Sequence, residues 1–256
     1  VPVVVTFHDL LPPYLFPKAG PLRPWSVRTL ARHADGVITT NAEDQHQLIH
    51  KLGVPTSKVS VIPIGSNIDP SPPAGFTPER WRASYDIARE DLLLGFFGFM
   101  NQSKGIETLI TSLAALTEAE VPVKLVFIGG RTGSSDRTNA EYADKIDALI
   151  AEWGLSDRIR APGFTDPSSI SAALLSLDLC VLPYRDGASL RHGRLHGALK
   201  HGAPIITTHP RVSAPQLRHG ENCYLIPPEE PEVLKDAVLT LASRPEQRKI
   251  LSQGAE

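Results

Sequence analysis

A histidine and an aspartate follow the first apolar run of the sequence, where they have side chains suited to acid-base chemistry. His8 and Asp9 come directly after the β-branched run Val1–Phe7, which predicts a buried parallel strand. A histidine at a strand end can act as a base or hydrogen-bond a ligand hydroxyl. His8 and Asp9 are therefore the candidate catalytic residues. The alternative is that both only cap a loop.

A lysine stands beside the start of a predicted helix in the segment 98–105, which reads Gly-Phe-Met-Asn-Gln-Ser-Lys-Gly. Backbone N–H groups at a helix start, together with a nearby lysine, suit a phosphate. The spacing is neither that of a P-loop nor that of a dinucleotide-binding fingerprint. We interpret Gly98, Asn101, Lys104 and Gly105 as candidate anion-binding residues. An ordinary loop with a solvated lysine is the alternative.

A second candidate anion site lies in the segment 186–194, again between a predicted strand and a predicted helix. It contains Gly187, Ser189, Arg191, Gly193 and Arg194. Glycines allow close backbone approach, a serine hydroxyl can donate to an oxygen, and arginines can bind a diphosphate in a fork. This combination is a stronger anion signal than a single lysine, with a flexible surface loop as the alternative.

Residues 202–208 form a fourth segment at a strand, and we interpret its glycine and proline as structural. Thr207 and Thr208 could still contact a ligand. The histidines between His192 and His209 match no metal-ligand spacing, so we predict no metal site.

The elements that must position these residues alternate between strands and helices. Such alternation predicts βαβ units, a parallel sheet and right-handed crossovers. Asn41 is the expected N-cap of the second helix. Strands are predicted at 1–7, 36–40, 59–63, 92–97, 123–128, 159–161, 179–182, 205–207 and 223–226, and helices at 25–33, 43–52, 105–116, 141–153, 168–175, 194–200, 212–218, 232–242 and 246–253.

The alternation is interrupted once, by a proline-rich stretch without periodicity before residue 79. We therefore predict an α/β protein with a partial Rossmann-like domain at 1–70, a linker at 71–78 and a nearly whole doubly wound domain at 79–256. The first domain is expected to be incomplete because each βαβ unit takes about 30 residues. The Val1 start and the single methionine, Met100, favour missing upstream sequence.

Composition excludes several classes of protein. The 256 residues carry 26 Lys and Arg against 28 Asp and Glu, so a nucleic-acid-coating protein is not expected. No apolar run approaches the ~20 residues that cross a bilayer. The two cysteines cannot form a disulfide framework or a four-ligand zinc site.

Taken together, the segments resemble the retaining, nucleotide-sugar-dependent glycosyltransferases of the GT-B fold, in the group 1 or GT4 family. Gly98–Gly105 is similar to that family's "GR-----KG" loop, and Gly202–Thr207 to its "G-PvvaT" segment. Further similar segments, in the family's order, are 33–41, 59–65, 125–130, 160–164 with 178–183, and 219–228.

The resemblance implies that the C-terminal domain holds a nucleotide-diphosphate sugar, which is a donor substrate, and that no cofactor is needed. Lys104 would pair with the donor phosphates, Asn101 would line the same loop, and Phe164 would lie near the nucleobase. His8 would lie by the transferred sugar. The acceptor hydroxyl would attack the face from which the diphosphate leaves, so the anomeric configuration would be retained.

Two departures from the family pattern concern the donor site. The family's Glu-x7-Glu pattern falls across Ser189 to Gly197, where both glutamates are absent, and the arginine of the "GR" loop is Phe99. We hypothesise that Ser189 and Arg191, with Gly193 beside them, take over phosphate contacts and that ribose recognition differs.

The favoured function is that of a metal-independent hexosyltransferase of polysaccharide biosynthesis, acting on a glycan, lipid-linked or small-molecule hydroxyl. A nucleotide-sugar-binding protein with lost catalysis is the second reading. A sugar-nucleotide epimerase ranks below it, because Asp9 and Asp186 are the few carboxylates near the predicted cleft. A cytoplasmic protein is expected. The basic residues Lys18, Arg23, Arg28 and Arg32 favour the inner membrane face, unless they only solvate the surface.

Overall fold

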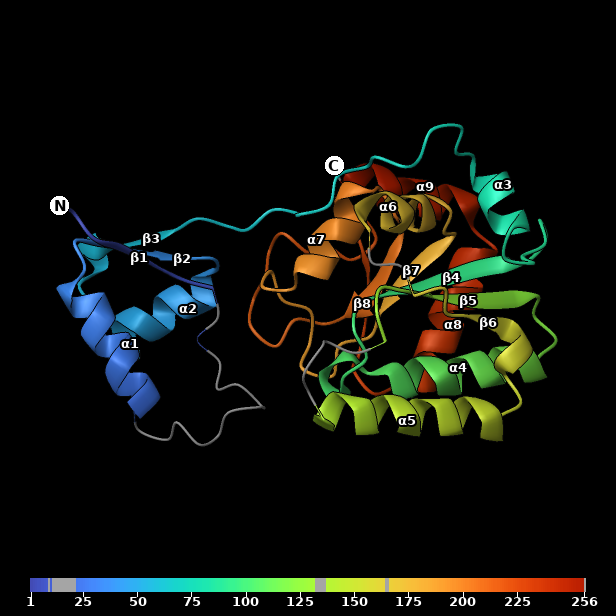
Figure 1. The fold of residues 1–256 in the computed structure, drawn as a ribbon, viewed down its shortest axis with the longest axis horizontal. Helices are drawn as coiled ribbons and strands as arrows, with labels where there is room; N and C mark the ends of the chain where they lie inside the picture. Colours follow the sequence, from blue (N-terminus) through green and yellow to red (C-terminus); the bar gives the residue numbers. More distant parts are fainter. Residues whose placement is uncertain (9, 11–21, 132–136, 164–165, 256) are drawn as a thin grey trace. The chain divides into compact units, whose positions relative to one another are not determined.

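The chain divides into two compact units, which are drawn in Figure 1. The computed structural model describes residues 1–8, 10, 22–131, 137–163 and 166–255. The first unit comprises residues 1–65 and the short segment 190–193, and the second comprises 66–189 and 194–256. The division thus falls before Ser66, whereas the sequence pattern places a linker at 71–78.

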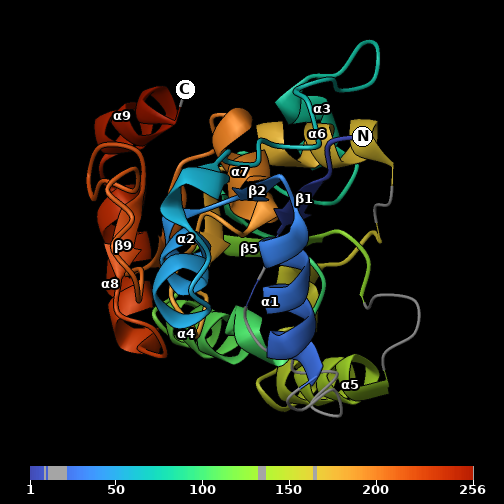
Figure 2. The ribbon, with the colours of Figure 1, turned by 90° about the vertical axis from the view of Figure 1, so that its left-hand side faces the viewer.

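The first unit contains a three-stranded parallel sheet in the order β1-β2-β3. Both α1 and α2 lie on one face of this sheet (Figures 1 and 2). Ala31, Val37, Leu48 and Val59 are buried between the layers. The elements are β1 (Val4–Phe7), α1 (Leu22–His33), β2 (Gly36–Thr39), α2 (Ala42–His46), the π-helical turn η2 (Gln47–Lys51), the 3-10 turn η3 (Thr56–Lys58) and β3 (Val59–Val61).

The first strand is less buried than its sequence predicts. It begins at Val4, whose exposed fraction is 58%, and exposed and half-buried residues alternate along it. The described helices cover only one face of the sheet, so every second side chain of β1 points away from the core. The expectation of a fully buried strand over Val1–Phe7 is therefore wrong for the described residues.

The second unit is built on a six-stranded sheet in which all pairings are parallel. Its strand order is β6-β5-β4-β7-β8-β9. The strands are β4 (Leu92–Phe97), β5 (Val123–Ile128), β6 (Ile159–Arg160), β7 (Leu179–Leu182), β8 (Ile205–Thr208) and β9 (Tyr224–Ile226). This is the doubly wound order. From β4 to β6 the chain adds strands toward one edge of the sheet, and from β7 to β9 it adds them toward the other edge, so the switch point of the topology lies between β4 and β7.

Helices cover both faces of this sheet, with α4, α5 and α8 on one face and α6 and α7 on the other (Figure 1). The helices and short 3-10 turns of the unit are α3 (Pro78–Ala83), η4 (Gln102–Lys104), α4 (Ile106–Glu118), α5 (Arg137–Glu152), η5 (Ser156–Arg158), α6 (Pro167–Leu175), α7 (Gly193–Lys200), α8 (Pro231–Ala242) and α9 (Pro245–Gly254).

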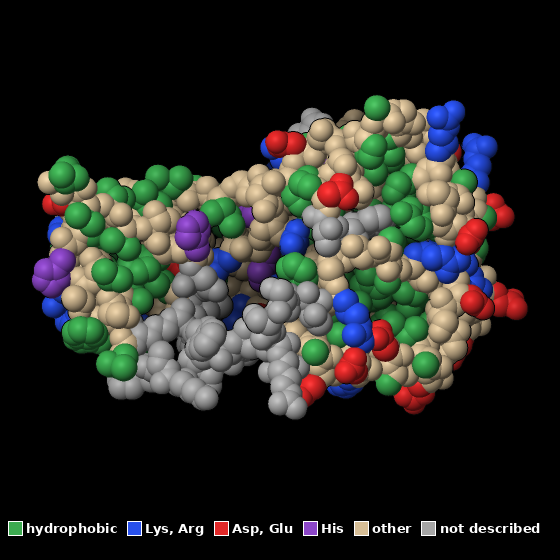
Figure 3. Space-filling model, in the orientation of Figure 1, with side chains coloured by type: hydrophobic (Ala, Val, Ile, Leu, Met, Phe, Trp, Pro, Cys, Tyr) green, Lys and Arg blue, Asp and Glu red, His purple; other side chains and the backbone are tan. Residues whose placement is uncertain are grey.

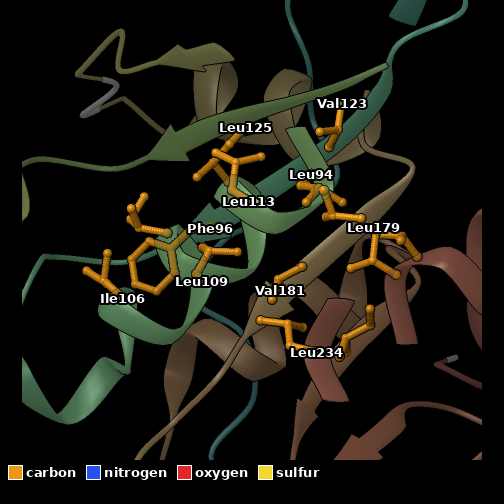
Figure 4. Close-up of a cluster of buried hydrophobic side chains, with 14 of the residues drawn as sticks. Leu94, Phe96, Ile106, Leu109, Leu113, Val123, Leu125, Leu179, Val181 and Leu234 are labelled. Carbon is orange, nitrogen blue, oxygen red and sulfur yellow. The ribbon is translucent and has the colours of Figure 1, made fainter. Parts of the chain in front are cut away.

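The core of the second unit lies between its central strands and helices α4 and α8. Side chains of β4, β5 and β7, among them Phe96, Leu125 and Val181, meet Leu109 of α4 (Figure 4). All four are at most 1% exposed. Strands buried on both faces are apolar throughout. Packing of these apolar runs in the core fixes where each strand ends and therefore where the loop after it starts.

One predicted helix is wrong. Residues 212–218 form bends and turns, because the interposed Pro215 limits helix propagation. The side chain of Asn222 holds the segment instead, accepting from Arg218 N at 2.8 Å and donating to the Gln216 carbonyl at 2.8 Å. The expected N-cap at Asn41 is confirmed, since its side chain accepts from Asp44 N at 2.8 Å.

The described surface of the second unit is mixed in character. On the face shown in Figure 3, basic and acidic side chains lie side by side over this unit. None of the helices in the described part of the chain is both long enough and apolar enough to cross a lipid bilayer.

Candidate functional site

The loop after β4 is held in shape by its own backbone and by Asn101. Gly98 has φ +152°, and its N–H donates to the Ile128 carbonyl at 2.9 Å. The Asn101 side-chain oxygen accepts from both Ser103 N at 3.1 Å and Ser103 Oγ at 2.7 Å. Asn101 therefore shapes the loop that leads to Lys104.

Gly105 joins this loop to the end of β7. Its φ is +65°, and a Cβ at this position would overlap the carbonyl oxygen of Pro183. The N–H of Arg185 also donates to the Ser103 carbonyl at 3.0 Å. The loops after β4 and β7 thus pack directly on one another, at the switch point between these two strands. Ligands of doubly wound folds bind at this point, at the carboxyl ends of the strands.

Lys104 is a cation at this junction. Its ammonium lies 4.9 Å from the ring centroid of Tyr184, which is 2% exposed. Among the described residues, none forms a hydrogen bond or ion pair with this ammonium. Burial lowers the pKa of Lys104 below its ordinary value of 10.5, while Asp186 opposes that shift and Arg194 adds to it.

Arg194 lies at the start of α7 and is half-buried. Its guanidinium carbon is 4.6 Å from the centroid of the Phe97 ring and 5.5 Å from that of Phe99. Burial lowers the pKa of Arg194, and Tyr184 opposes the shift. No hydrogen bond or ion pair joins this guanidinium to any residue that the structure describes.

The loop after β7 is fixed by the loop after β8. Gly187 has φ +83°, and a Cβ there would lie 2.6 Å from the His209 carbonyl oxygen. The Thr208 hydroxyl donates to the Tyr184 carbonyl at 2.8 Å, and that of Thr207 donates to the Leu182 carbonyl at 2.7 Å. These two threonines therefore support the loop, and their hydroxyl protons are already committed.

Arg191 has carboxylate partners. It belongs to the segment 190–193 of the first unit, and its guanidinium pairs with Glu43 and, at 3.3 Å, with Asp44 Oδ1. The Arg191 side chain is 7% exposed. A ligand phosphate would have to compete with these two carboxylates for the same guanidinium, and its phosphate-binding role stays a prediction.

The other predicted residues occupy varied positions. His8 is exposed in the first unit, and its carbonyl accepts from the Thr40 hydroxyl at 3.1 Å. Ser189 is half-buried, and Gly193 opens α7 with open space where a side chain would start. Asp9 and Phe164 lie outside the described residues.

The aromatic residues Phe97, Phe99 and Tyr184 were not among the predicted site residues. Phe97 and Tyr184 are buried, so their apolar character suggested only a core role. Phe99 could have been found from the sequence, because it stands at the arginine position of a loop that the motif had already singled out, and the structure leaves it 40% exposed.

A hollow in the second unit lies apart from this junction. A hollow of about 240 Å³ lies beside Asp178 and Pro204, which precede β7 and β8, and so lies at the amino ends of these strands. Within the described ranges, no group of three or more His, Cys, Asp or Glu side chains is arranged to hold a metal ion.

A doubly wound sheet with two cations at its switch point, neither of them ion-paired within the described residues, defines a Rossmann-like domain suited to an anionic ligand. The chain belongs to the glycosyl transferases group 1 family, whose model matches residues 78–256. Residues 1–65 match the model of a glycosyl transferase 4-like domain. The resemblance drawn from the motifs is thus confirmed, and the family is one of enzymes.

Curated relatives and solved structures agree with this assignment. D-inositol 3-phosphate glycosyltransferase of Corynebacterium glutamicum is 23% identical over 86% of this chain and 51% of its own length. Phosphatidyl-myo-inositol mannosyltransferase of Mycobacterium leprae is 26% identical over 94% of this chain and 58% of its own. The crystal structure of Anabaena HepE with UDP and glucose has a TM-score of 0.80 at 21% identity, covering 99% of this chain and 65% of that one.

These likenesses confirm the GT-B fold class. The chain spans 51% and 58% of the two curated relatives named above.

Proposed function

We propose that this protein transfers a sugar from a nucleotide-diphosphate sugar to a hydroxyl acceptor and binds the donor diphosphate at the carboxyl ends of β4 and β7. The Lys104 ammonium is the observation that carries the proposal. It is held at the switch point of the sheet, and no ion pair with another described residue neutralises it. An anionic ligand at this point would supply the missing counter-charge.

The proposed chemistry needs charge stabilisation above all. As the bond between the anomeric carbon and the diphosphate oxygen breaks, negative charge develops on the leaving diphosphate. A preorganised cation in a site shielded from water stabilises such charge more strongly than water does. We assign this role to Lys104, with the amino end of α7 beside it, and propose that transfer needs no metal ion and retains the anomeric configuration.

The acceptor side of the reaction belongs to the first unit in this proposal. His8 is exposed there and is the candidate for taking the proton of the acceptor hydroxyl. The names of two relatives include an inositol phosphate and a phosphatidylinositol, which supports a hydroxyl acceptor of the sugar or lipid-linked class. Arg28 and Arg32 are exposed on α1, which supports association with the cytoplasmic face of a membrane.

Binding without transfer is the second candidate. Ser189 and Gly197 stand where the family pattern has its two glutamates. A Cβ at Gly197 would lie 2.8 Å from Phe97 Cε1, so the buried Phe97 ring fills the space into which a side chain at 197 would extend. A chain without these carboxylates can hold a donor and yet fail to transfer its sugar.

The test is to incubate the protein with UDP-, GDP- and ADP-sugars, with and without a panel of sugar and inositol-lipid acceptors. Acceptor-dependent release of a nucleoside diphosphate, absent in Lys104→Met, is expected of a transferase. Donor binding without release would assign the second candidate. Failure to bind any donor would refute both.

A further inference from the structure

Arg194 occupies a position that the protein without an anionic ligand stabilises poorly. It is a cation in the first turn of α7, where the helix dipole presents its positive end and no acidic residue is present. Its half-buried guanidinium has lost part of its hydration. A residue selected for stability alone would more often be acidic or neutral at such a place.

A second cation increases this repulsion. Arg194 and Lys104 are close enough for the Arg194 charge to lower the pKa of Lys104. Asp186 is the acidic residue that acts on Lys104 in the opposite direction. Neither cation forms an ion pair with a residue in the described part of the chain. All of these unfavourable interactions would be relieved by one ligand that carries negative charge to both side chains.

The aromatic rings fix where the guanidinium can act. Phe97 and Phe99 lie at 4.6 and 5.5 Å from the guanidinium carbon, distances at which the ring faces attract a cation. These contacts leave the N–H groups of the guanidinium available for a planar, forked interaction with phosphate oxygens. Gly98 lies beside the stem of Arg194, 3.8 Å from its Cγ to the position of a Cβ, so no side chain there shields the guanidinium.

We propose that Arg194, held against Phe97 and Phe99, is the second cation of the donor site and binds one phosphate of the diphosphate while Lys104 binds the other. This inference rests on the proposed function and adds a residue to it. It places the second cation on α7, because position 99 in the loop after β4, where the family pattern has an arginine, is a phenylalanine in this chain. Two cations, one in the loop after β4 and one in the first turn of α7, select a diphosphate over a monophosphate.

The test compares affinities for UDP, GDP and ADP with those for the corresponding monophosphates, measured by calorimetry on the full chain. In the wild type the best diphosphate should bind more tightly than its monophosphate. Arg194→Gln should weaken diphosphate binding ~10- to 100-fold, the range for losing a hydrogen bond to a charged group, and should largely abolish the preference over the monophosphate. Arg194→Lys should restore part of it.

Two controls separate this role from a structural one. Arg89→Gln removes the same charge from an exposed position of the same unit and should leave both affinities unchanged. The melting temperature of Arg194→Gln should stay level or rise, because a cation leaves the start of α7, whereas loss of a purely structural arginine would lower it.

The outcomes also distinguish the two proposals. If the wild type binds nucleoside diphosphates and Lys104→Met does not, but Arg194→Gln binds as the wild type does, the role of Arg194 is overturned and the proposed function stands. If the wild type binds no nucleoside diphosphate, the proposed function fails together with this inference.

Discussion

Lys104 and Arg194 are the two cations that we propose bind the donor diphosphate. Each is partly buried, each contacts an aromatic ring, and neither has a carboxylate partner in an ion pair within the described ranges. Removal of either charge should therefore separate binding from stability, because within the described residues the variant loses a contact with an aromatic ring but no ion pair, while it loses affinity for an anion.

For Lys104→Met we expect the free energy of unfolding at neutral pH to rise by roughly 1 kcal/mol, the order of the penalty for an uncompensated polar group. The folded pKa of Lys104 is lowered by burial, so between that pKa and 10.5 the unfolded chain binds more protons. Wild-type stability then increases with pH, and the advantage of the variant should shrink as the pH approaches 10.5.

Urea unfolding of the two proteins across this pH range measures the difference directly. Lys51→Met, at an exposed lysine of η2, is the control and should show no such trend. A Lys104→Met variant less stable than the wild type at neutral pH would mean that the ammonium has a stabilising partner, contrary to the account.

The sequence placed Lys104 and Gly105 correctly in the loop after β4, because both follow an apolar run that fixes where the strand ends, and their binding roles stay predictions. It could not distinguish Arg191 from Arg194, which are three residues apart in one segment. The difference arises from tertiary partners that are distant in sequence, since Glu43 and Asp44 pair with Arg191 whereas Phe97 and Phe99 contact Arg194.

At the scale of elements, the site depends on the contact between the loops after β4 and β7. Gly105→Ala should reduce the free energy of unfolding by about 2–4 kcal/mol, since a Cβ there would be strained by the positive φ and would also displace the Pro183 carbonyl. Nucleoside diphosphate affinity should fall as well. Chemical denaturation and calorimetry measure the two effects.

Gly154→Ala is the matched control for this change. Gly154 has φ +64°, nearly that of Gly105, but no atom lies within 4 Å of its Cβ position. Its substitution should cost only the conformational strain, about 1–2 kcal/mol. Equal losses in the free energy of unfolding for Gly105→Ala and Gly154→Ala would show that the loops after β4 and β7 do not pack closely at Gly105.

A second prediction at this scale concerns α7 and the end of β4. Gly197→Ala should destabilise the protein by about 1–2 kcal/mol, because its Cβ would lie 2.8 Å from the buried Phe97 ring. In a Phe97→Leu background the clash is absent, so the same substitution should stabilise the helix by up to about 1 kcal/mol. If urea unfolding shows that Gly197→Ala still lowers the free energy of unfolding in the Phe97→Leu background, the proposed clash with the Phe97 ring is wrong.

At the scale of the whole molecule, the sequence predicted the alternating elements and the parallel sheets closely, because strands buried on both faces are continuous apolar runs. The prediction failed where the local sequence pattern indicates one structure and tertiary packing favours another. Val1–Phe7 has the composition of a buried strand, yet its exposure depends on whether a layer covers each face. Residues 212–218 have helical spacing, but Pro215 and the hydrogen bonds of Asn222 favour turns.

The arrangement of the second unit also explains why the hollow beside Asp178 and Pro204 is not the expected donor site. The hollow beside Asp178 and Pro204 lies at the amino ends of β7 and β8, whereas Lys104 and Arg194 follow carboxyl ends. Doubly wound sheets bind ligands at the carboxyl ends, where the backbone N–H groups of helix starts converge. The direction of the strands thus decides between the two places.

A crystal structure of the protein soaked with UDP, or with the nucleoside diphosphate that binds most tightly, tests the central claim most directly. We expect the diphosphate at the carboxyl ends of β4 and β7, with phosphate oxygens within hydrogen-bond distance of Lys104 Nζ. A diphosphate bound in the hollow beside Asp178, or bound anywhere without contact to Lys104, would contradict it.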